Sequence, residues 1–202
     1  SACAAQTGSL EVASQQGQNG GAPALTRQHF KDTTTLKDDA LETSATLTSI
    51  NGFQQQRGLL GLVLNDSFLR AFVDKKTGKA TYQLYQVLTY RASGWRLYQI
   101  ANFETPAGPQ SKRVTLIGKT MACPRPRSGE CSYSEQLVME VDEALLRAIV
   151  ENSKDAPGAN WKFKFKAKSG DEFADAMSTA EIAGFLARVG EYQNGRLLAQ
   201  AH

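Results

Sequence analysis

The most regular pattern of apolar and polar positions lies near the end of the chain. In residues 161–168, every second residue is apolar and a lysine follows each apolar residue. A period of two predicts a β-strand, because successive side chains of a strand point to opposite faces of the sheet. Large aromatic side chains are costly to expose. We therefore expect Trp161, Phe163 and Phe165 to face the core, and the outward face to carry Lys162, Lys164, Lys166 and Lys168.

Weaker forms of the same alternation predict further strands. Their segments are rich in β-branched and aromatic residues, and Gly-, Pro- and Ser-containing turns separate several of them. Short turns favour pairing between consecutive strands, so an antiparallel meander is expected. The predicted strands are 41–50, 68–73, 80–90, 95–103, 114–123, 132–141 and 172–176.

Helical spacing is found after these strands. Asp142 precedes an apolar stripe in residues 143–150 and is suited to cap a helix. Ser178 and Glu181 have the spacing of a capping box, in which each side chain bonds to a free backbone N–H of the first turn. The sequence thus predicts an α+β fold: an antiparallel β meander or sheet, with a helix near 142–152 and a C-terminal helix near 179–193 packed on it.

The N-terminal part of the chain has a different composition. Residues 1–30 are rich in Gln, Gly, Ala and Ser and contain few large apolar side chains. Such a composition is typical of a flexible tether. Residues 31–202 have the length and apolar content of a single domain with its own core. We therefore expect a tether, 1–30, followed by one α+β domain, 31–202.

Two cysteines enclose a turn between two predicted strands. Cys123 and Cys131 flank a segment with two prolines and a Ser-Gly pair. Facing residues of a hairpin lie close enough for a disulfide, which predicts that these cysteines are bonded. The alternative is a pair of free cysteines in a cytosolic protein. A disulfide indicates an oxidising compartment.

Other roles for the cysteines fit poorly. With three cysteines, and with the two histidines near opposite ends of the chain, the sequence offers no compact zinc ligand set. The spacing of Cys123 and Cys131 also differs from the Cys-x-x-Cys redox pair. We expect no metal site and no cofactor.

The third cysteine stands near the start of the sequence, in Ser1-Ala2-Cys3. These residues resemble the end of the lipobox of bacterial lipoproteins. The resemblance implies a precursor with a signal peptide that is cut before Cys3, and a lipid anchor on Cys3. Ala4 stands where some inner-membrane lipoproteins carry Asp, so the resemblance favours the periplasmic face of the outer membrane.

Net charge, hydropathy and the search for motifs argue against several classes of function. The net charge of +3 is small for a protein that binds nucleic acid, so we do not expect nucleic acid as a partner. The longest strongly apolar run, residues 58–64, is far shorter than the roughly 18 to 20 residues that span a membrane. No nucleophile elbow or complete phosphate-binding loop is found in the sequence.

The lysine row is the best candidate for a binding surface, with Arg125 and Arg127 as a second basic spot. Lysines can attract anionic lipid, lipopolysaccharide or an acidic envelope protein, but they can also protect an edge strand from aggregation. The expected function is that of a non-enzymatic cell-envelope lipoprotein whose β domain binds or scaffolds another envelope component. The alternatives are a periplasmic hydrolase with dispersed acidic residues and a small-ligand carrier.

Overall fold

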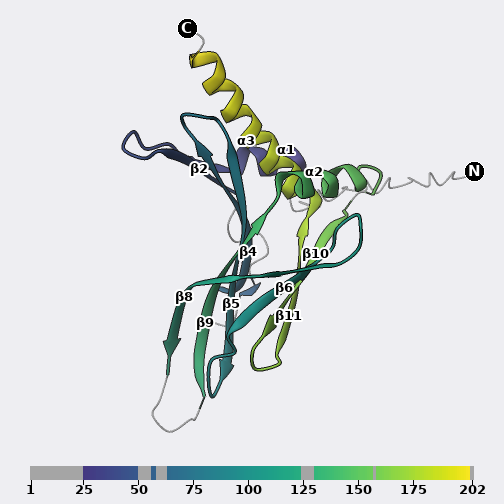
Figure 1. The fold of residues 1–202 in the computed structure, drawn as a ribbon. Helices are drawn as coiled ribbons and strands as arrows, with labels where there is room; N and C mark the ends of the chain where they lie inside the picture. Colours follow the sequence, from purple (N-terminus) through teal and green to yellow (C-terminus); the bar gives the residue numbers. More distant parts are fainter. Residues whose placement is uncertain (1–24, 50–55, 58–62, 124–129, 157, 201–202) are drawn as a thin grey trace, which may run out of the picture.

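The computed structural model describes residues 25–49, 56–57, 63–123, 130–156 and 158–200. This part of the chain forms two antiparallel sheets and three helices (Figure 1). The strands run in long hairpins away from one end of the molecule, where the helices gather. The predicted α+β class, with helices packed on antiparallel sheet, is confirmed.

The larger sheet has seven strands in the order β1-β2-β4-β5-β9-β8, with β3 paired to β4. Its middle strands β4, β5 and β9 are the longest, and each pairs with its neighbours over most of its length. The bounds are β1 Thr35–Lys37, β2 Ser44–Thr48, β3 Gln56–Arg57, β4 Val63–Asp74, β5 Ala80–Ala92, β8 Thr115–Ala122 and β9 Cys131–Val141.

The smaller sheet has the order β11-β10-β6-β7. Strand β10 lies inside this sheet, because it pairs with β11 on one side and with β6 on the other. The bounds are β6 Tyr98–Phe103, β7 Gln110–Arg113, β10 Asn160–Ala167 and β11 Glu172–Ser178.

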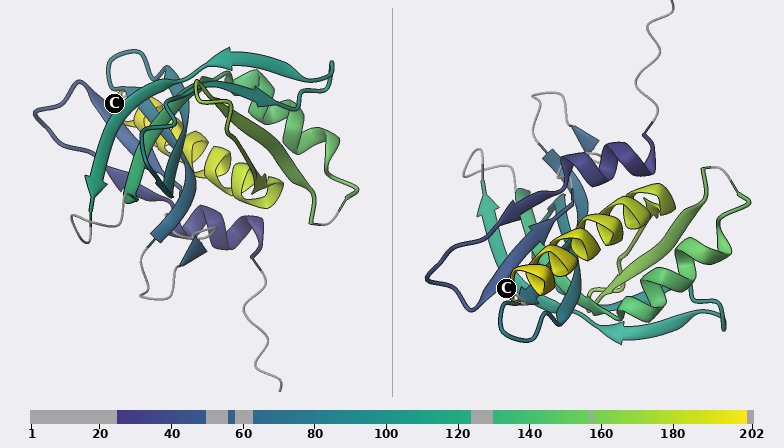
Figure 2. Two further views of the ribbon diagram at one scale, coloured as in Figure 1. Left: turned by 90° about the horizontal axis from the view of Figure 1, so that it is seen from below. Right: turned by 90° about the horizontal axis from the view of Figure 1, so that it is seen from above.

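Three helices cover one end of the sheets: α1 Arg27–Thr33, α2 Glu143–Asn152 and α3 Thr179–Gln200. In the view from above, α3 runs between α1 and α2 (Figure 2, right). Gly184 permits the close approach of α1 and α3, because a Cβ atom at this position would lie 2.5 Å from the carbonyl oxygen of Arg27. Both predicted helices are present, and α3 continues past the expected end at 193. Helix α1 was not predicted.

One hydrophobic core joins the two sheets, α2 and α3. Strand β10 contributes Trp161, Phe163 and Phe165, which are all almost fully buried. The direction predicted for these aromatic side chains is therefore confirmed. Helix α3 adds its apolar stripe, which consists of Ile182, Phe185, Leu186 and Val189.

Consecutive pairing holds for the β4–β5, β8–β9 and β10–β11 hairpins but is interrupted after β5. There the chain leaves the larger sheet, and the segment predicted as strand 95–103 forms a strand only from Tyr98 onward. Leu97 has a φ of 58°, and the carboxylate of Glu135 accepts hydrogen bonds from the amides of Leu97 (2.9 Å) and Tyr98 (3.0 Å). These bonds hold the turn that directs β6 into the smaller sheet.

Candidate functional site

The lysines of β10 project from the outer face of the smaller sheet. Lys162 and Lys166 are exposed, Lys164 is half-buried, and the exposed Lys168 follows the end of the strand. Because β10 is hydrogen-bonded on both sides, its lysines do not protect a free strand edge. Protection against edge-to-edge pairing therefore does not explain this row.

Two carboxylates lie among these lysines. Glu172 on β11 accepts a hydrogen bond from Lys164 at 2.8 Å and lies 3.8 Å from Lys166, and Glu104 lies 3.9 Å from Lys162. The hydrogen bond from Lys164, together with both lysine charges, lowers the pKa of Glu172 below its ordinary value. Three lysine charges thus face two carboxylates, and the outer face keeps a small positive excess.

The outer face is also hollowed. An open depression of about 510 Å³ lies over β10, β6 and β11, and its lining is mostly apolar. The small side chains of Ala174 and Ala176 on β11 lie opposite Lys164 and Lys162 in the pairing register, which leaves space beside the lysine stems. The depression also borders Asn102, Phe103, Glu104, Pro109, Phe163 and Asp175.

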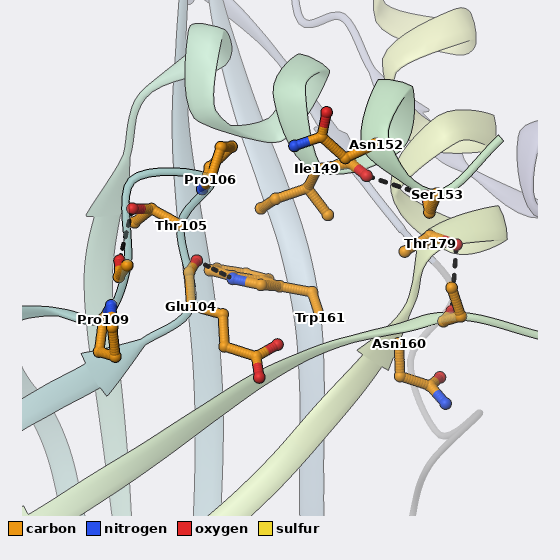
Figure 3. Close-up of a pocket in the computed structure, with 12 residues that line it drawn as sticks. Glu104, Thr105, Pro106, Pro109, Ile149, Asn152, Ser153, Asn160, Trp161 and Thr179 are labelled. Carbon is orange, nitrogen blue, oxygen red and sulfur yellow. Dashed lines mark hydrogen bonds between the residues drawn. The ribbon is translucent and has the colours of Figure 1, made fainter. Parts of the chain in front are cut away.

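A second cavity of about 380 Å³ lies next to this depression, and Glu104 and Pro109 line both (Figure 3). Its walls come from the β6–β7 loop, from the C-terminal end of α2 and from the starts of β10 and α3. The indole N–H of Trp161 donates to the carbonyl oxygen of Glu104 at 3.0 Å, which joins β10 to the loop. We name this cavity the Trp161 pocket.

A group of acidic side chains lies inside the molecule, on the other face of the smaller sheet. Glu181 in the first turn of α3 is 1% exposed, and one of its oxygens accepts a hydrogen bond from Ser49 at 2.8 Å. Among the described residues, its other oxygen has no hydrogen-bond partner. Burial, together with the negative charges of Asp66 and Asp175, raises the pKa of Glu181 to about 7.

Asp175 on β11 belongs to the same group. Its carboxylate takes side-chain hydrogen bonds from Gln86 and Ser67, and burial is the main cause of a pKa above the ordinary value. No sequence pattern indicated this cluster, because its residues come from distant segments that only the fold brings together. They are Ser49, Asp66, Asp175 and Glu181. The spacing of Ser178 and Glu181 predicted a capping box. Ser178 does accept a bond from the amide of Ala180 at 3.2 Å, but Glu181 bonds to Ser49 instead.

The described part of the chain shows no group of three His, Cys, Asp or Glu side chains placed to hold a metal ion. Within the same part, no helix has the length and apolar composition that a membrane crossing requires.

The cysteine prediction is confirmed for one pair. Cys123 and Cys131 form a disulfide that joins the end of β8 to the start of β9. Cys3, Arg125 and Arg127 lie outside the described residues.

Comparison of the chain with protein-family models, with curated proteins and with solved structures finds no match.

Proposed function

We propose that this chain is a non-enzymatic lipoprotein of the bacterial cell envelope, anchored through Cys3 at the periplasmic face of the outer membrane. Its β domain binds anionic lipid or lipopolysaccharide phosphate groups through the outer face of the smaller sheet. The observation that carries this proposal is the lysine row on a fully paired inner strand, beside an open depression. The disulfide supports an oxidising compartment.

The acidic cluster gives less support to a hydrolase. Two carboxyl groups with raised pKa values are a feature of many active sites. Glu181, however, is 1% exposed, so a substrate cannot reach its carboxyl group without a rearrangement of the core. Asp175 borders the outer depression, and neither Asp66 nor Glu181 is among the described residues that line the depression or the Trp161 pocket.

A vesicle-binding experiment tests the lysine face. Lysines near an anionic membrane contribute up to about 1 kcal/mol each, and salt screens this attraction. We expect the chain to bind phosphatidylglycerol-containing vesicles and lipopolysaccharide at low salt. Changing Lys162, Lys164 and Lys166 to Gln should weaken binding to both and reduce its salt dependence, as measured by co-sedimentation.

A matched variant controls for net charge. Lys37, Lys76 and Lys79 are exposed lysines of the β1–β2 and β4–β5 regions, and changing them to Gln removes the same total charge. This control should bind almost as well as the unaltered chain. Equal loss in both triple variants, or no binding by the unaltered chain at low salt, would show that the lysine row is not a binding face.

The anchor is tested separately in the precursor. Changing Cys3 to Ala should abolish incorporation of labelled lipid and release the domain from the membrane fraction. Membrane association that survives the change would contradict the lipoprotein proposal, whatever the vesicle experiment shows.

A further inference from the structure

The hydroxyl and indole donors that line the Trp161 pocket are used within the protein, which leaves the side-chain amides of Asn152 and Asn160 as its other side-chain donors. Three hydroxyl groups line it, and each already donates to a backbone carbonyl oxygen of its own wall. Thr105 donates to Gly108 at 2.6 Å, Ser153 to Ile149 at 2.8 Å and Thr179 to Ala159 at 3.0 Å. The indole N–H of Trp161 is used in the same way.

The pocket also carries negative charge. Among the described residues that line it, Glu104 is the only charged one. Its side chain is about half exposed, and Figure 3 shows its carboxylate extending beside the indole ring of Trp161. Oε2 of this carboxylate accepts a hydrogen bond from the amide of Lys162 at 3.3 Å. Its remaining acceptor capacity and its negative charge favour a ligand that donates hydrogen bonds and carries positive charge.

The protein already places an ammonium group beside this carboxylate. The Nζ atom of Lys162 lies 3.9 Å from Glu104 Oε1, at the outer limit of an ion pair, and the lysine side chain is 71% exposed. Exposed pairs of this kind are weak, so a bound cation can replace the lysine at little cost. Lys162 lines the outer depression and not the pocket itself.

Apart from Asn152 and Asn160, the remaining lining is apolar, and it is well fixed. Ile149 of α2 and the two loop prolines, Pro106 and Pro109, lie around the buried edge of Trp161 (Figure 3). The wall on the β10 side is held by the Trp161 bond and by the amide of Glu104, which donates to the carbonyl of Lys162 at 3.1 Å. Proline side chains lose little entropy when a ligand packs on them.

From these contacts we propose that the Trp161 pocket binds a small organic cation. The ammonium group of the ligand pairs with Glu104, and its apolar body lies between Ile149 and the loop prolines. The pocket volume of about 380 Å³ falls within the range of about 300 to 1,000 Å³ that is typical of small-molecule sites. This site does not depend on the lysine face. The ammonium group of Lys162 competes with the bound cation for Glu104 and does not bind it.

Nuclear magnetic resonance of the two indole N–H groups tests the proposal on the whole chain. Trp161 reports on the pocket, and Trp95, which packs on Tyr133 of the larger sheet, serves as an internal control. The probes are benzylamine, which is protonated at neutral pH, and benzyl alcohol, its neutral analogue. We expect saturable shifts of the Trp161 signal with benzylamine, no comparable shifts of Trp95, and at least about tenfold weaker binding of benzyl alcohol.

Charge variants locate the interaction. Glu104→Gln should weaken benzylamine binding at least about tenfold, while Glu172→Gln, which removes a carboxylate from the same sheet outside the pocket, should leave it unchanged. Lys162→Gln should strengthen binding several-fold, because it removes the competing ammonium. A structural role for Glu104 would not produce this gain.

Three results would overturn the proposal. These are equal binding of benzylamine and benzyl alcohol, no effect of Glu104→Gln on benzylamine binding, and no saturable shift of the Trp161 indole signal with either probe. Since none of these measurements involves an anionic surface, they are independent of the vesicle experiment.

Discussion

Two glutamates are almost fully buried between the sheets, and their surroundings differ. Glu135 on β9 is 0% exposed and accepts hydrogen bonds from the hydroxyl of Tyr90 and from the amides of Leu97 and Tyr98. Glu181 on α3 is 1% exposed and accepts one bond, from Ser49, while other carboxylates lie near it. A buried glutamate thus stabilises the backbone around β9, whereas a buried glutamate at the start of α3 destabilises the fold.

The difference shows that the effect of a buried carboxylate is set by its donors and not by its depth. Glu135 uses its hydrogen-bond donors to fix the turn before β6. A buried carboxylate with few donors, in contrast, holds a proton to avoid an uncompensated charge. Glu181 is expected to be protonated in a large fraction of molecules near neutral pH.

The largest expected effect concerns the pH dependence of stability. The pKa of Glu181 is about 7 in the folded chain and lies near its ordinary value of 4.5 when unfolded. A raised pKa stabilises the fold below the unfolded value, and this stability is lost as pH rises through the folded value. Between about pH 4.5 and pH 8, Glu181 should therefore reduce the free energy of unfolding by about 3 kcal/mol.

Glu181→Gln keeps the acceptor for Ser49 and removes the titration. Urea unfolding should show that this variant is more stable than the unaltered chain at pH 8, by about 3 kcal/mol, and equally stable at pH 4. Glu191→Gln, an exposed position on the same helix, should show no gain at pH 8. A Glu181→Gln variant that is less stable than the unaltered chain at pH 8 would show that the ionised Glu181 side chain does not destabilise the fold.

A smaller effect of opposite sign is expected at Glu135. In Glu135→Gln an amide nitrogen replaces one carboxylate oxygen. This nitrogen cannot accept the hydrogen bond that the oxygen accepted from a backbone N–H. A buried donor left without an acceptor costs about 1 to 3 kcal/mol. Urea unfolding at pH 8 should therefore show a loss of about 2 kcal/mol, and the amides of Leu97 and Tyr98 should exchange faster with solvent. Unchanged stability and exchange would mean that Glu135 does not hold the turn.

The smallest effect is expected on the lysine face. Glu172 pairs with Lys164 and Lys166 in solvent-exposed positions. Exposed ion pairs contribute little to stability, so Glu172→Gln should leave the free energy of unfolding almost unchanged. The same variant should increase vesicle binding, because it removes one of two carboxylates that offset the lysines. Weaker vesicle binding would show that Glu172 itself contacts the lipid.

The sequence predicted those features that depend on local spacing. The alternation in residues 161–168 predicted the direction of each aromatic side chain of β10, and the apolar stripe after Ser178 predicted α3. The Cys123–Cys131 disulfide could also be predicted from the sequence, because the turn between two strand-like segments brings these residues together. Helix α1 was missed, since its seven residues depend on the close contact with α3 at Gly184.

Features that join distant segments were decided by the tertiary structure alone. Ser49 and Glu181 are 132 residues apart, and the capping-box spacing assigned Glu181 to its own helix end. The Trp161 pocket needs the β6–β7 loop, the end of α2 and the start of β10 at one place. A sequence pattern records which face of an element is apolar, because that is fixed by backbone geometry. Which elements share a core, and hence which polar groups lose their water, depends on how those faces pack together.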